Sequence, residues 1–173
     1  EDNIYIVGRN GSETTGIGHL TLTKINSDGQ IVWDNWYNDQ ANNFYVGVVG
    51  RLLEDRIVVA GKRGGNYIIH QVAYNGETIA SVQKSFADVI MSNMWLDQEG
   101  ATYIGNETGE YKITKLDLNG DTLWTYVKPP VMNFPNLLEA SLKNVTFDTN
   151  NNTYIAGHYY TEETRSDCLI TKL

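Results

Sequence analysis

The chain has 173 residues, of which 41% are hydrophobic and 20% charged, and its formal net charge is −8. An acidic surface does not suit nucleic acid or anionic membranes, and no apolar run approaches the roughly 20 residues of a spanning helix, so we expect neither nucleic-acid binding nor membrane insertion. Cys168 is the single cysteine, which excludes an internal disulfide and any CxxC metal or redox motif.

Two sequence patterns recur along the chain. The first is a strand-like run with a glycine near its end, and it reads IYIVGR (4–9), IVVAGK (57–62), TYIGN (102–106) and TYIAGH (153–158). The second contains a polar turn and reads TKINSDGQIVW (23–33), HQVAYNGETIA (70–80), TKLDLNGDTLW (114–124) and the beginning of a fourth copy, TKL (171–173). The turn glycines Gly29, Gly76 and Gly120 are 47 and 44 residues apart. Periods of ~40–50 residues made of short strands are typical of β-propeller blades.

The repeats predict strands in chain order, with one blade for each repeat. The expected strands are 4–8, 20–25 and 31–37; 45–53, 56–61, 67–73 and 78–86; 90–96, 101–105, 111–116 and 122–127; 138–147, 153–157 and 168–173. We therefore predict an all-β segment of a β-propeller over residues 1–173, with about four blades of four antiparallel strands at 1–43, 44–89, 90–136 and 137–173. The first and last blades each lack a strand. Because unpaired strand edges invite association, we expect a missing segment or another chain to complete the propeller.

The stretch Asp117-Leu118-Asn119-Gly120-Asp121 fits two structures, a calcium-binding loop or a tight hairpin. A helix-loop-helix calcium site needs glycine at loop position six and a bidentate glutamate at position twelve, where this chain has Thr122 and Lys128. The other repeats share only a glycine preceded by Asp or Asn, and glycine readily adopts the left-handed conformation that such hairpins require. The pattern favours a hairpin, and we predict no metal.

These repeats resemble the β-propeller repeats of secreted bacterial proteins, which carry Tyr-Ile-Val/Ala-Gly, a variable loop and then Thr-Lys-Leu-Asp-x-x-Gly-x-x-x-Trp. The resemblance covers nearly the whole chain. The second repeat departs most, with Gln71 in place of the Lys and Ala80 in place of the Trp. The resemblance implies an extracellular or cell-surface bacterial protein, of the kind often exported by the type IX secretion pathway, and it is almost silent about function.

The two ends of the predicted blades differ in their loops. The hairpin turns at one end are short, whereas the other end has the segments 9–18, 62–66, 106–109 and 158–167. Binding usually resides in long loops on a rigid scaffold. The candidate ligand-binding residues at this end are Arg9, Trp36, Lys62, Arg63, Asn106, His158, Tyr159 and Tyr160. The alternative is that these residues only solvate and cover the sheet ends.

Two other recurrences have structural explanations. Trp33 and Trp124 recur at one blade position, where we expect packing between blades. A lysine recurs at 24, 115 and 172, and we expect it on the solvent face of a strand, where it guards against edge pairing.

Catalysis finds little support in the sequence. His19, His70 and His158 fall at different points of their repeats, without the grouping of a metal site, and we predict no catalytic residue and no cofactor. The predicted function is a non-catalytic extracellular recognition or scaffold module that binds a protein or glycan. The alternative is part of a carbohydrate-active or other propeller enzyme whose active site is completed outside this segment.

Overall fold

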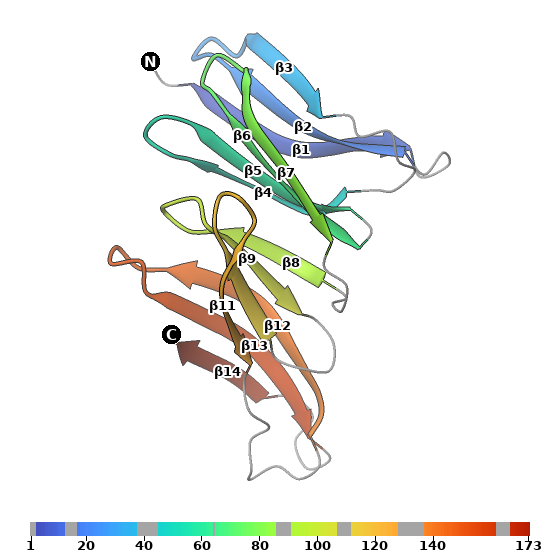
Figure 1. Ribbon diagram of the computed structural model, residues 1–173, viewed down its shortest axis with the longest axis vertical. Helices are drawn as coiled ribbons and strands as arrows, with labels where there is room; N and C mark the ends of the chain where they lie inside the picture. The colour runs from blue at the N-terminus through green and yellow to red at the C-terminus, as the bar shows by residue number, and fades with distance from the viewer. Residues whose placement is uncertain are drawn as a thin grey trace. The chain divides into compact units, whose positions relative to one another are not determined.

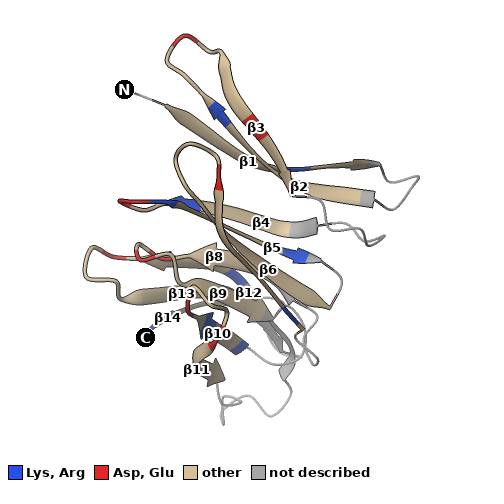
Figure 2. Ribbon diagram, turned by 45° about the horizontal axis from the view of Figure 1, so that its top comes forward, with Lys and Arg blue, Asp and Glu red and all other residues tan. Residues whose placement is uncertain are grey.

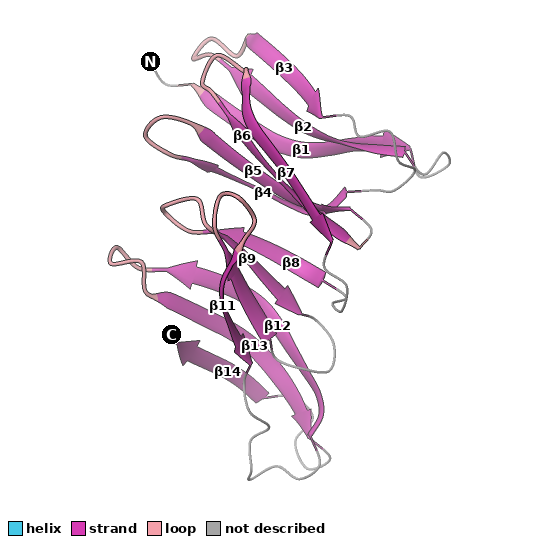
Figure 3. Cartoon of the chain, viewed as in Figure 1, coloured by secondary structure: helices cyan, strands magenta, loops and turns pink. Residues whose placement is uncertain are grey.

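A computed structural model describes residues 3–12, 17–37, 45–63, 65–85, 91–106, 112–127, 137–161 and 167–173. The described residues form strands and turns without a helix, and the strands make four antiparallel sheets (Figures 1 and 3). The all-β prediction is therefore confirmed. None of the described residues belongs to a helix that could cross a membrane. By its internal contacts the chain divides into an N-terminal unit, Glu1–Ala87, and a C-terminal unit, Asp88–Leu173.

The N-terminal unit contains two sheets. The first has the order β1-β2-β3, with β1 at Ile4–Ser12, β2 at Ile17–Ile25 and β3 at Ile31–Tyr37. The second has the order β4-β5-β6-β7, with β4 at Tyr45–Leu52, β5 at Ile57–Arg63, β6 at Asn66–Val72 and β7 at Thr78–Ser85. The core of this unit consists of residues from both sheets, among them Leu20, Leu22, Ile57, Val59, Ile68 and Val72.

The C-terminal unit also contains two sheets. The first has the order β11-β10-β9-β8, with β8 at Met91–Leu96, β9 at Thr102–Asn106, β10 at Lys112–Leu116 and β11 at Thr122–Val127. The second has the order β12-β13-β14, with β12 at Leu137–Phe147, β13 at Thr153–Thr161 and β14 at Asp167–Lys172. Its core likewise draws on both sheets and includes Ala101, Tyr103, Ile113, Leu142, Val145 and Ile155.

Two hairpins are longer than the sequence predicted. The β1–β2 pairing continues to Ser12 opposite Ile17, and β13 pairs with β14 as far as Tyr159 opposite Asp167. The predicted loops 9–18 and 158–167 are therefore too long, because backbone hydrogen bonding carries the ladder beyond the apolar residues that mark a strand in the sequence. Each sheet still lies within one of the four predicted ranges.

Five turns of the described chain share one design. They span 26–30, 73–77, 97–101, 117–121 and 148–152, and in each the first residue's N–H donates to the fifth residue's carbonyl while the fourth residue's N–H donates back to the first residue's carbonyl. The fourth residue has a positive φ and is Gly29, Gly76, Gly100, Gly120 or Asn151. This geometry is the hairpin with a left-handed bulge residue that the glycines predicted.

The side chain of the first turn residue stabilises this geometry in four of the five turns. The Asp117 Oδ1 accepts hydrogen bonds from the backbone N–H groups of Asn119 and Asp121, at 2.9 and 2.8 Å. Asn26, Asp97 and Asp148 do the same in their own turns. The stretch 117–121 is thus a hairpin, as predicted, and its first carboxylate stabilises the backbone. Figure 2 shows many of the acidic residues at such turns and many of the basic residues on strands.

Candidate functional site

A tyrosine and a lysine face each other across neighbouring strands in three of the four sheets. The pairs are Tyr5–Lys24, Tyr103–Lys115 and Tyr154–Lys172, with each Nζ 5.6, 5.1 and 5.3 Å from the ring centroid of its partner. Such a position over an aromatic face is a cation–π contact. In the β4–β7 sheet the equivalent pair is Val58–Gln71, so both the tyrosine and the lysine are replaced there.

A tryptophan extends this pair by one strand in two of the sheets. Lys24 lies opposite Trp33, and Lys115 lies opposite Trp124. We call these three-residue sets the Tyr–Lys–Trp rows. Lys24 and Lys115 are partly buried, so the expected solvent-face position is wrong for both, whereas Lys172 is exposed on β14 at the edge of its sheet.

In the N-terminal unit a turn covers the row. The Tyr74 carbonyl at the β6–β7 turn accepts hydrogen bonds from Lys24 Nζ at 3.5 Å and from Trp33 Nε1 at 3.3 Å. The Gly76 carbonyl accepts a third hydrogen bond, from Asn35 Nδ2 at 2.5 Å. The Tyr74 ring packs against Tyr5, with centroids 5.8 Å apart. The ammonium and the indole N–H are therefore satisfied by backbone carbonyls.

In the C-terminal unit the same row borders an open cavity of about 430 Å³. The β8–β11 sheet contributes Tyr103, Lys115, Trp124, Thr125 and Tyr126 to the cavity wall, and the β12–β14 sheet with its adjoining residues contributes Asn151, Asn152, Thr153 and Leu173. The wall thus combines three aromatic rings with amide, hydroxyl and ammonium groups.

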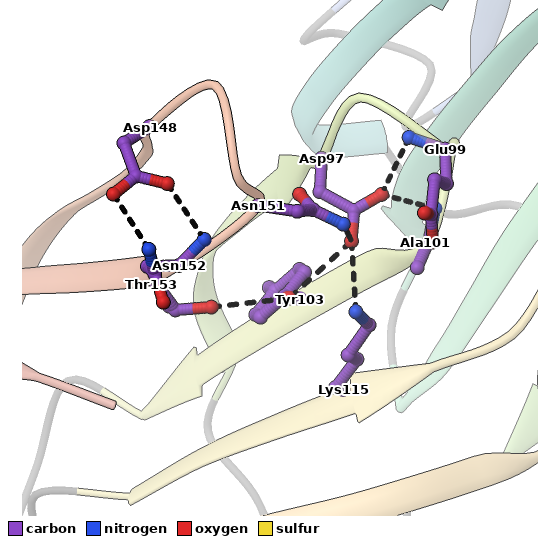
Figure 4. Close-up of polar contacts among 9 residues, drawn as sticks. All are labelled: Asp97, Glu99, Ala101, Tyr103, Lys115, Asp148, Asn151, Asn152 and Thr153. Carbon is purple, nitrogen blue, oxygen red and sulfur yellow. Dashed lines mark hydrogen bonds and ion pairs between the residues drawn. The ribbon is translucent and has the colours of Figure 1, made fainter.

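A fully buried carboxylate organises one side of this cavity (Figure 4). The Asp97 Oδ2 accepts hydrogen bonds from Lys115 Nζ at 2.9 Å and from the Tyr103 hydroxyl at 3.3 Å. The Asp97 Oδ1 accepts hydrogen bonds from the N–H groups of Glu99 and Ala101 in its own turn. The carboxylate is neutralised and hydrogen-bonded on both oxygens, which is what a buried charge requires.

Lys115 stays protonated in this setting. Burial alone would lower the pKa of Lys115, but hydrogen bonds to Tyr103 and Asp97 and the charge of Asp97 outweigh it, and the pKa is raised above its ordinary value. An ammonium held in this way can donate a hydrogen bond, but it is not available as a general base.

The opposite wall of the cavity contributes Asn151 and Thr153, which bond to the groups around Asp97. The Asn151 Nδ2 donates to Asp97 Oδ2 at 3.4 Å, and the Thr153 hydroxyl shares a hydrogen bond with the Tyr103 hydroxyl at 3.2 Å. The Asn151 Oδ1 is buried and receives no hydrogen bond from the residues that the structure describes.

The residues predicted to bind a ligand lie on strands of both units. In the N-terminal unit Arg9 lies opposite Leu20 on β2, Trp36 opposite Thr21, Lys62 opposite Tyr67 and Arg63 opposite Asn66. In the C-terminal unit Asn106 lies opposite Met91, His158 opposite Ser141, Tyr159 opposite Ala140 and Tyr160 opposite Glu139. Of Arg9, Trp36, Lys62 and His158, whose side chains the structure describes, none lines the cavity. All eight occupy paired strand positions instead of loops, and a binding role for them stays a prediction.

The sequence contains a signal for the cavity that was assigned to packing alone. Trp33 and Trp124 were both expected to pack between blades because they recur. Both pack against the core of their unit. Trp33 lies beneath a turn, whereas Trp124 also borders the cavity and contacts Tyr103 edge to face at 5.7 Å. Recurrence identified the position correctly but could not show whether it is covered.

Comparisons with known proteins support the fold alone. No protein-family model and no curated protein matches the chain. A protein of unknown function from Bacteroides caccae, with a crystal structure at 1.35 Å resolution, is similar with a TM-score of 0.52 and 12% identity over 90% of this chain and 56% of that one. A Lactobacillus plantarum protein is similar with a TM-score of 0.51 and 12% identity over 92% of this chain and 52% of that one. The chain thus spans little more than half the length of either, and both share its β-rich fold.

Proposed function

We propose that the chain is a non-catalytic recognition or scaffold module built from β-propeller blades, and that it binds a protein or glycan. The regular succession of four antiparallel sheets supports this architecture, as does the face-to-face core within each unit. We also propose an extracellular or cell-surface location in a bacterium, since the repeats resemble those of secreted proteins. Further strands, from the same polypeptide or from another, would complete the ring.

The observation that carries the binding proposal is the wall of the cavity in the C-terminal unit. Trp124, Tyr126 and Tyr103 offer flat rings, which suit the apolar face of a sugar or a protein side chain. The Lys115 ammonium adds a charged donor. Aromatic surface with a few directed polar groups is the usual composition of a ligand-binding pocket.

The state of the charged groups favours binding over catalysis at this cavity. Asp97 is fully buried and engaged by Lys115, by Tyr103 and by its own turn. A carboxylate in such a network has a structural role, and the raised pKa of Lys115 keeps the ammonium charged. A general acid or base needs a proton that can leave or arrive near the working pH.

A screen of glycans and peptides against the full chain would test this proposal, with Trp124→Ala as the site variant. We expect a binder whose affinity falls at least tenfold in Trp124→Ala, since stacking area is lost, while Leu123→Ala retains it. Leu123 is the matched control because it is an exposed apolar residue of the same strand that does not line the cavity. Binding that is lost in a Lys62→Ala, Arg63→Ala double variant but kept in Trp124→Ala would move the site to the predicted strand-end surface.

A further inference from the structure

We draw no further inference here: the strongest candidate, the outer edge of β11 with the exposed side chains of Leu123 and Val127, carries nothing because no residue that the structure describes shows what would cover it.

Discussion

The two units present the same Tyr–Lys–Trp row in opposite states. In the N-terminal unit the β6–β7 turn covers the row and accepts its hydrogen bonds, and in the C-terminal unit the row borders a cavity. The lysine also has a different partner in each, a backbone carbonyl for Lys24 and the Asp97 carboxylate for Lys115. The comparison teaches that one residue pattern can lie beneath a turn or border a cavity, according to what packs on it.

The largest expected effect comes from removing the carboxylate that sets Lys115 apart from Lys24. Asp97→Ala should lower the free energy of unfolding by about 3–5 kcal/mol, because it leaves a partly buried ammonium unpaired and removes the hydrogen bonds of the turn. Denaturant titration followed by tryptophan fluorescence measures this loss.

Asp117→Ala is the matched control for that substitution. Asp117 holds the same kind of turn in the same unit, and its carboxylate bonds to backbone N–H groups of that turn. We expect a cost of about 1 kcal/mol from the lost hydrogen bonds. Equal losses for the two variants would show that the ion pair with Lys115 contributes nothing.

The next largest effect compares the two tryptophans of the rows. Trp33→Ala should destabilise the protein by about 3 kcal/mol, since it opens a void beneath a turn and removes the donor to Tyr74. Trp124→Ala should cost less than Trp33→Ala, because one side of its ring already faces the cavity. The difference in midpoint between the two denaturation curves measures this contrast, and a reversed order would contradict the assignment of covered and open rows.

Substitutions at Gly29 and Gly76 distinguish backbone strain within a turn from contact between the turn and the Tyr–Lys–Trp row. Gly29→Ala places a side chain in open space at a φ of +79° and should cost about 1 kcal/mol of backbone strain. Gly76→Ala carries the same strain and also forces Trp33 or Asn35 to move, so we expect roughly 1 kcal/mol more. If thermal unfolding shows equal losses, the β6–β7 turn does not press on the row.

The smallest effect is a dependence of stability on pH in the alkaline range. The pKa of Lys115 is raised in the folded protein, so its contribution is complete below the ordinary lysine pKa of 10.5 and is lost as pH rises through the folded value. The free energy of unfolding, measured between pH 9 and pH 12 around the ordinary lysine pKa, should therefore fall as the pH rises. Asp97→Asn should flatten the profile, because the charge and hydrogen bond that favour the ammonium are weakened.

Local patterns explain why the strands and turns could be predicted from the sequence. The glycines at 29, 76 and 120 mark turns because the left-handed backbone is a property of a few neighbouring residues. The ends of the β1–β2 and β13–β14 hairpins could not be predicted, since polar segments such as 9–12 form strands only through pairing with a second segment.

The candidate site depends on contacts that are remote in sequence. The partner of Lys115 is Asp97, which lies in a turn on the far side of β9, and no repeat pattern links their charges. Whether Trp124 is covered depends on a different sheet from its own. For these reasons the sequence predicted a buried role for Trp124 and a solvent-facing one for Lys115, and the site was expected at the opposite strand ends.

Hydrogen exchange of the two indole N–H groups, measured on the unmodified chain, tests the central claim most directly. The Trp33 and Trp124 resonances can be assigned with Trp33→Phe and Trp124→Phe variants. We predict slow exchange for Trp33, whose N–H is bonded to the Tyr74 carbonyl, and fast exchange for Trp124. Equal protection of both N–H groups would contradict the claim that one row is covered and the other open.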